Sequence, residues 1–118
     1  DGEILPEVKL LLVNLMNIGK PIVALCVSPV VIAKALEGST FNAEVTIGTT
    51  KEKSPYNILD FIKGLEKSGL KTEMKSIKEI NVDPINKIVT APCYMMDASI
   101  LEVRKNIRSA IEALRDLV

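Results

Sequence analysis

Cys26 is the residue whose type and position best fit chemistry. It follows a short apolar run, Pro21 to Leu25, and an amphipathic run begins just after it, near Ser28 and Pro29. Five apolar residues between turn signals are typical of a buried parallel strand, and proline is typical of the first position of a helix. We therefore predict that Cys26 lies where a strand turns into a helix. The helix dipole there favours the thiolate, and the backbone N–H of Val27 would point toward an oxyanion formed by attack of the sulfur.

The absence of histidine narrows the chemistry further. The sequence contains no histidine at all, so Ser-His-Asp, Cys-His and zinc–histidine sites cannot be assembled from this chain alone. Cysteines, carboxylates, lysines, hydroxyls and backbone dipoles remain, together with groups from another polypeptide segment. We predict no metal site and no cofactor.

Composition excludes several classes of protein. With 118 residues the chain is one domain at most, and a hydrophobic share of 47% is enough for a core. Fifteen Lys and Arg balance fifteen Asp and Glu, so no basic field exists to hold nucleic acid. The apolar runs are far shorter than a membrane span, and two cysteines do not indicate a disulfide framework. We expect neither a nucleic acid nor a membrane as a partner.

Apolar spacing and turn residues predict alternating helices and short strands. Helices are expected over residues 4–16, 29–37, 55–68 and 98–117, and strands over 21–25, 44–47, 72–75, 79–82 and 87–91, the last two as a hairpin. The predicted inner faces are Ile4, Leu5, Val8, Leu11, Leu12, Leu15 and Met16 in the first helix, Ile58, Leu59, Ile62 and Leu65 in the third, and Leu101, Arg104, Ile107, Ile111 and Leu114 in the last. This order is typical of an α/β sandwich with a mainly parallel sheet.

Several blocks of the sequence resemble one known family. They are Gly19–Ile22, Cys26 with Pro29, Val45–Gly48, Val82–Asp83, Asn86–Thr90, Pro92 and Tyr94–Met95. These blocks are similar to the ElbB family (enhancing lycopene biosynthesis), a branch of the DJ-one/PfpI superfamily that is related to class I glutamine amidotransferase domains. The loop Ser54–Tyr56 resembles an insertion of the eukaryotic, mitochondrial members.

The resemblance carries expectations for the fold and the site. It implies a flavodoxin-like three-layer sandwich with Cys26 at the nucleophile elbow. It also implies that residues 1–118 are the C-terminal portion of a single domain whose N-terminal half is absent from this chain. In the superfamily that half carries an oxyanion loop and an acidic residue, usually Glu, that partners the cysteine.

Partners and location follow from the same resemblance. The expected partner is the N-terminal segment of the same domain, missing here or supplied by a separate chain, and the expected assembly is a homodimer. The expected location is cytoplasmic, or mitochondrial if the source is eukaryotic. Val27 stands where several relatives of the wider superfamily carry histidine, which disfavours amidase or protease activity.

Other residues are expected around Cys26. Ser28, Gly48, Thr49, Pro92 and Tyr94 are predicted to line a pocket, since strand ends of a parallel sheet meet at its carboxyl edge. Turn formation by Gly48 and packing by Tyr94 are equally consistent with the sequence. We interpret Cys93 as structural and Asp83 as a turn residue.

Three functions remain open. The first is a glyoxalase- or deglycase-like reaction, in which the Cys26 thiolate adds to a reactive α-oxoaldehyde. The second is a redox or stress response, in which Cys26 is oxidised to a sulfinate without turnover. The third is a non-catalytic interaction domain. The lack of histidine disfavours hydrolysis but does not separate these three.

Overall fold

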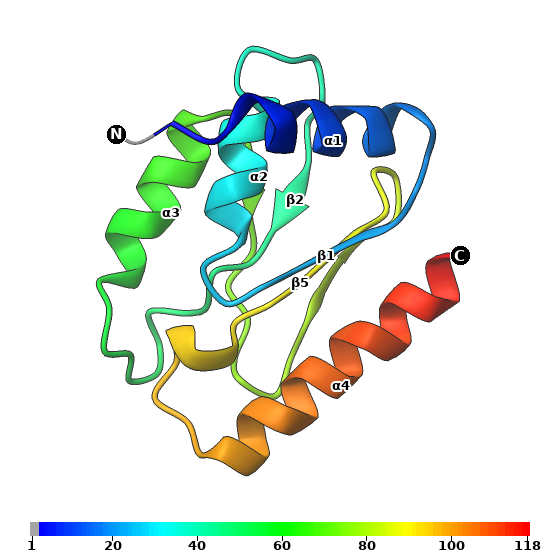
Figure 1. The fold of residues 1–118 in the computed structure, drawn as a ribbon. Coiled ribbons are helices and arrows are strands. Elements are labelled where there is room, and N and C mark those ends of the chain that lie inside the picture. Colours follow the sequence, from blue (N-terminus) through cyan, green and yellow to red (C-terminus); the bar gives the residue numbers. More distant parts are fainter. Residues whose placement is uncertain (1–2) are drawn as a thin grey trace.

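The structure, a computed structural model, describes residues 3–118 as an α/β sandwich (Figure 1). Its elements are α1 (Pro6–Asn17), β1 (Ile22–Leu25), α2 (Pro29–Leu36), β2 (Glu44–Val45), α3 (Ile58–Lys67), β3 (Lys71–Thr72), β4 (Asn81–Asp83), β5 (Ile88–Ala91), a 3₁₀ turn η1 (Cys93–Met95) and α4 (Ile100–Leu117). Figure 1 shows α1 and α2 on one side of β1 and β5, and α4 on the other side. The predicted order of helices and strands is confirmed.

The main sheet has the strand order β1-β5-β4. β1 and β5 are parallel, with Ile22 opposite Ile88 and Leu25 opposite Ala91. β4 and β5 form the predicted antiparallel hairpin. The central strand β5 is buried along its whole length, which suits a strand with helices on both faces.

Strands β2 and β3 form a second, parallel pair. Both strands are shorter than the sequence predicted. Regular pairing covers only residues 44–45 and 71–72. Beyond β3, two more backbone hydrogen bonds still join the same two segments of the chain. The Glu73 N–H donates to the Val45 carbonyl at 2.9 Å, and the Lys75 N–H donates to the Gly48 carbonyl at 3.2 Å.

Side chains connect the two strand groups. The Thr46 N–H donates to Thr90 Oγ1 on β5 at 2.9 Å, and the Glu44 N–H donates to Asp83 Oδ2 on β4 at 2.9 Å. Asp83 also accepts from the N–H groups of Ile85 and Asn86, both at 3.1 Å, so it fixes the hairpin turn as well. Asp83 is therefore a turn residue, as predicted, and it also binds a neighbouring strand.

The predicted inner face of the last helix is wrong. Leu101 is 57% exposed and Ile111 is 47% exposed, and Arg104 is exposed too. The buried residues of α4 are Val103, Asn106 and Ala110. The helix has apolar residues on two sides, and the side with the smaller residues is the one that packs on the sheet. Periodicity alone could not choose between them.

The first and third helices differ from the prediction in similar ways. Met16 is the buried residue of α1, whereas Leu5 and Leu11 of its predicted inner face are mostly exposed. On α3, Ile58, Ile62 and Leu65 are buried as predicted, but Leu59 is 45% exposed.

The starts of α3 and α4 are set by side-chain caps. α3 begins at Ile58, after Asn57, whose side chain accepts from the Asp60 N–H at 3.2 Å. The predicted start near residue 55 is three residues too early, and Ser54 Oγ donates to the Met95 carbonyl in the loop before the helix. α4 begins after Ser99, which forms a capping box with Glu102.

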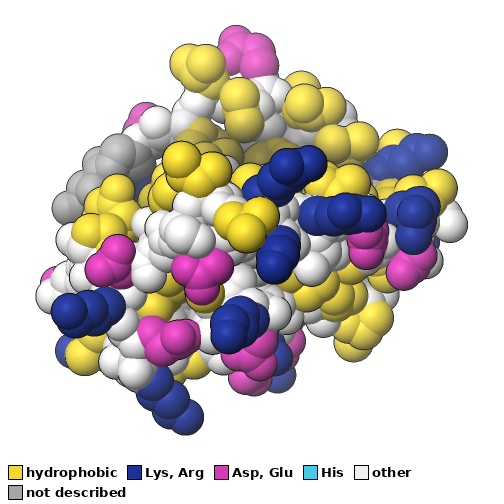
Figure 2. Space-filling view, turned by 90° about the horizontal axis from the view of Figure 1, so that it is seen from below, with side chains coloured by type: hydrophobic (Ala, Val, Ile, Leu, Met, Phe, Trp, Pro, Cys, Tyr) yellow, Lys and Arg dark blue, Asp and Glu magenta, His cyan; other side chains and the backbone are white. Residues whose placement is uncertain are grey.

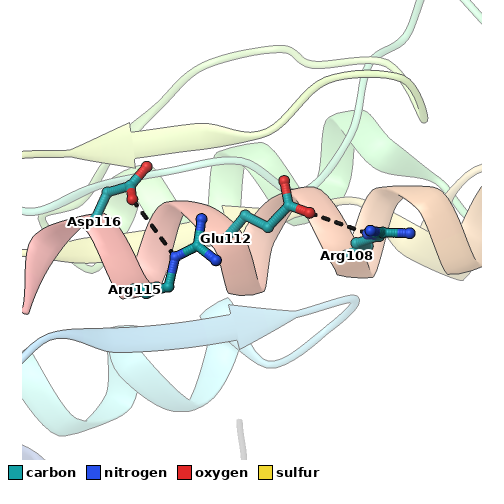
Figure 3. Close-up of polar contacts among 4 residues, drawn as sticks. All are labelled: Arg108, Glu112, Arg115 and Asp116. Carbon is teal, nitrogen blue, oxygen red and sulfur yellow. Dashed lines mark hydrogen bonds and ion pairs between the residues drawn. The ribbon is translucent and has the colours of Figure 1, made fainter.

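The outer surface mixes apolar and charged side chains. The ion pairs Arg108–Glu112 and Arg115–Asp116 lie on exposed parts of α4 (Figure 3), at 3.0 and 3.8 Å. Pairs this exposed contribute little to stability. Figure 2 shows exposed hydrophobic side chains among side chains of both charges on the face seen from below.

Candidate functional site at the turn after β1

Cys26 lies in the turn between β1 and α2, as the sequence predicted. Its backbone has φ 60°, in the left-handed region that non-glycine residues rarely adopt. The Cys26 N–H donates to the Ala91 carbonyl at 3.0 Å, and the Ser28 N–H donates to the Leu25 carbonyl at 3.0 Å. These bonds hold the strained turn against the end of β5. The Cys26 side chain is partly exposed.

The turn leads directly into α2 and leaves one N–H group open. The helix begins at Pro29, and the Val27 and Ser28 carbonyls accept from Val30 and Val31 at 3.0 and 2.9 Å. The Ser28 side chain makes no capping hydrogen bond. Within residues 3–118, the Val27 N–H donates to no backbone or side-chain acceptor. An oxyanion role for this donor beside Cys26 stays a prediction.

Cys93 lies beside Cys26, which the sequence did not reveal. It follows β5 by two residues, has φ 50°, and is 2% exposed. Burial raises the pKa of the Cys93 thiol, the Cys26 N–H lowers this pKa, and charge on the Cys26 sulfur raises it. The turns that carry the two cysteines come together because β1 and β5 are neighbours, and no local pattern in the sequence predicts that pairing.

Hydrogen bonds fix the position of the segment after β5. The Cys93 N–H donates to Asn106 Oδ1 at 2.9 Å, and Asn106 Nδ2 donates to the Glu79 carbonyl at 2.8 Å. The Met96 N–H donates to the Cys93 carbonyl at 3.2 Å. Asn106 is a buried polar residue of α4 that sequence reasoning did not single out. It positions the Cys93 turn.

The other predicted pocket residues differ in exposure. Gly48 and Thr49 are buried, Pro92 is fully buried, and Tyr94 is 51% exposed. Gly48 has φ 123°, and a Cβ there would lie 2.8 Å from Met96 Sδ, so close packing and backbone both require glycine. Pro92 and Tyr94 flank Cys93 in sequence. A pocket formed by these residues and Ser28 over Cys26 stays a prediction.

A groove of about 520 Å³ lies elsewhere, between α2 and α3. Its lining includes Val30, Phe61 and Leu65 together with the charged residues Lys34 and Asp60. Cys26 is not part of this lining.

No hydrogen bond between Cys26 and a carboxylate is found in the described part of the chain. The carboxylates that accept hydrogen bonds there, all from groups other than Cys26, are Glu66, Glu79, Asp83, Glu102 and Glu112. Residues 3–118 also contain no cluster of three or more His, Cys, Asp or Glu side chains able to hold a metal ion. None of the helices described is both long and apolar enough to span a membrane.

Comparison with known proteins identifies relatives over nearly the whole chain. No protein-family model matches it. The chain is 33% identical over 121 residues to the human mitochondrial glutamine amidotransferase-like class 1 domain-containing protein 3, and this match covers 99% of the chain and 42% of that protein. It is 31% identical to the rat mitochondrial ES1 protein homolog, covering 99% of the chain and 43% of that protein. The chain thus spans less than half of the length of these two relatives.

A solved structure agrees with the sequence comparison. The crystal structure of an isoprenoid biosynthesis protein with an amidotransferase-like domain from Ehrlichia chaffeensis superposes with a TM-score of 0.82 at 27% identity. The superposition covers 98% of this chain and 49% of that one. The predicted α/β, flavodoxin-like fold is confirmed.

Proposed function

Because the chain is homologous to part of the glutamine amidotransferase-like class 1 domain proteins of the DJ-one/PfpI type, ElbB-like proteins among them, we propose that Cys26 is its nucleophile and acts on reactive α-oxoaldehydes. Cys26 then occupies a nucleophile elbow, with Val27 as an oxyanion donor. The observation that carries this proposal is the left-handed turn at Cys26, with φ 60°, next to the open Val27 N–H. A strained, partly exposed nucleophile beside a free donor is the arrangement that carbonyl addition needs.

The reaction begins with addition of the Cys26 sulfur to the aldehyde carbon. A C–S bond forms, the carbonyl electrons move to oxygen, and protonation of that oxygen gives a hemithioacetal. The Val27 N–H stabilises the negative oxygen before protonation. The adjacent ketone of an α-oxoaldehyde makes the following proton transfer accessible.

A carboxylate then moves a proton between the two carbons. It removes the proton from the former aldehyde carbon while the ketone oxygen takes up a proton, which gives an enediol. It then returns the proton to the former ketone carbon while the hydroxyl on the former aldehyde carbon loses its proton, which leaves a thioester on Cys26. Water cleaves the thioester and restores the thiol, so one oxoaldehyde and one water give one 2-hydroxy acid.

We propose that the carboxylate comes from outside residues 1–118. The carboxylates that accept hydrogen bonds in the described residues accept them from groups other than Cys26, and the chain covers 42% of its human relative. In this proposal residues 1–118 form the C-terminal portion of one domain. The preceding segment supplies the acid, and a homodimer is the assembly.

Methylglyoxal tests this proposal with the full-length protein. Hydroxy acid release is measured over time, and peptide mapping locates the adduct. Cys26→Ser is expected to lower the rate by at least about a thousandfold, the order expected when a nucleophile is removed. Cys93→Ala serves as the control and is expected to retain activity, since Cys93 takes no part in the addition. Equal rates for wild type and Cys26→Ser, or no hydroxy acid from the wild type, contradict the proposal.

A further inference from the structure

Backbone geometry brings the two cysteines of the chain to one end of the sheet. β1 and β5 pair in parallel with Leu25 opposite Ala91, and the Cys26 N–H donates to the Ala91 carbonyl at 3.0 Å. Cys26 directly follows Leu25, and Cys93 follows Ala91 by two residues. Continuing this register places Cys26 opposite Pro92, one residue before Cys93. Neighbouring strands lie about 4.8 Å apart, which is within the range of Cα separations that a disulfide spans.

The Cys93 thiol is buried, and the Cys26 turn influences it. Burial raises the pKa of this thiol, the Cys26 backbone lowers that pKa, and charge on the Cys26 sulfur raises it. The thiol therefore lies close enough to the Cys26 turn for its pKa to depend on Cys26.

Both cysteines hold left-handed backbone conformations, with φ 60° at Cys26 and 50° at Cys93. Each such conformation costs on the order of 1–3 kcal/mol and persists only where the surroundings impose it. For Cys93 that support is the hydrogen bond of its N–H to Asn106 Oδ1, and Asn106 is held in turn by the Glu79 carbonyl. The pair is thus preorganised, so little backbone ordering remains for the two sulfurs to join.

We propose that Cys26 and Cys93 form a reversible peroxide-responsive pair, in which Cys26 is oxidised and Cys93 closes an intramolecular disulfide. Hydrogen peroxide is the oxidant. The Cys26 sulfur attacks one peroxide oxygen, the O–O bond breaks, and the products are a sulfenic acid and water. The Cys93 sulfur then attacks the Cys26 sulfur, an S–S bond forms, and the S–O bond breaks with loss of a second water. Two thiols are oxidised by two electrons, and one peroxide is reduced.

Exposure fixes the order of these steps. Cys26 is partly exposed, so a peroxide reaches it from solvent, whereas Cys93 is 2% exposed and is shielded from solvent. A buried partner resolves the sulfenic acid before a second peroxide oxidises it irreversibly to a sulfinate. This role goes beyond the proposed function, and it needs no substrate turnover.

The test uses full-length protein, reduced and then exposed to a small excess of hydrogen peroxide. After alkylation of free thiols, mass spectrometry of unreduced peptides is expected to detect the Cys26–Cys93 linked pair. Dithiothreitol should restore both thiols. Cys26→Ser is expected to leave Cys93 unoxidised, because solvent does not reach it. Cys93→Ala is expected to accumulate Cys26 sulfinate.

A wild-type protein that gives Cys26 sulfinate without the linked peptide overturns the proposal, as does disulfide formation only between molecules. Far-ultraviolet circular dichroism of Cys93→Ala checks that the variant is folded. Cys93→Ser is the second variant if Cys93→Ala is unfolded, and sulfinate at Cys26 is again expected, since a hydroxyl cannot resolve the sulfenic acid. The linked peptide is scored without any aldehyde, so failure of the glyoxalase-like reaction is recognised separately.

Discussion

Cys26 combines three properties that bear on its chemistry. It has a left-handed backbone, it is partly exposed, and the N–H of the next residue has no acceptor among residues 3–118. A buried cysteine chosen only for packing needs none of them. Its place between strand and helix could be predicted because apolar runs and proline are local signals. The nearness of Cys93 could not, because it depends on which strands pair.

A single residue, Cys93, sets the expected pH dependence of disulfide closure. Burial raises the pKa of the Cys93 thiol, so at neutral pH most of it is protonated, and only the thiolate attacks the Cys26 sulfenic acid. Below this raised pKa, the rate of closure is expected to increase about tenfold for each unit of pH. In the described part of the chain, besides burial, the groups that shift this pKa belong to Cys26.

Quenched-flow alkylation after a peroxide pulse measures this rate between neutral and alkaline pH. The formation of the sulfenic acid is followed in Cys93→Ala as the control, so that its own pH dependence is divided out. A closure rate that stays flat or falls as pH rises would show that Cys93 is not the attacking thiol.

At the scale of elements, side-chain hydrogen bonds join strands of residues 3–118 that no backbone hydrogen bonds connect. Thr90 on β5 accepts the Thr46 N–H at 2.9 Å, and both residues are fully buried. A turn-like sequence signal predicted the hairpin of β4 and β5 correctly. Nothing local predicts that a threonine hydroxyl joins the segment after β2 to the central strand, since this contact spans 44 positions of the chain.

Replacing Thr90 by valine tests this link. Valine keeps the shape of the side chain but removes the acceptor, so the buried Thr46 N–H loses its partner. The free energy of unfolding is expected to fall by about 1–3 kcal/mol. Thr90→Ser keeps the hydroxyl and should lose less, because only a methyl group is removed. Urea denaturation of the three proteins measures the difference, and a valine variant as stable as wild type would show that the bond contributes nothing.

At the scale of the whole molecule, α1 and α4 each have an apolar face that no other part of residues 3–118 covers. On α1, Leu10 and Leu11 are 62% and 58% exposed, although most of the helix is apolar. On α4, Leu101 and Ile111 are exposed on the side away from the sheet. A helix that is apolar on several sides is typical of a buried position. The sequence analysis predicted that Leu11, Leu101 and Ile111 face inward. That prediction holds only if a further part of the protein packs on these faces of α1 and α4.

The relatives supply the reason to expect such packing, because the chain covers only 42% of the human protein. We therefore predict that, in the full-length protein, the outer face of α1 is covered by the segment outside residues 1–118. Leu11→Gln should then lower the free energy of unfolding by about 2 kcal/mol or more, since an apolar side chain leaves a buried site and an amide enters it. Glutamine and leucine have similar helix propensity, so the helix itself is not penalised.

Ile85→Gln is the matched control, because Ile85 is 89% exposed in the hairpin turn and has nothing to lose on substitution. Its effect is expected to stay within about 0.5 kcal/mol. Both variants are measured in the full-length protein by denaturant unfolding. If Leu11→Gln is as mild as Ile85→Gln, the outer face of α1 is a solvent-exposed surface, and the segment proposed to supply the carboxylate does not pack on this helix.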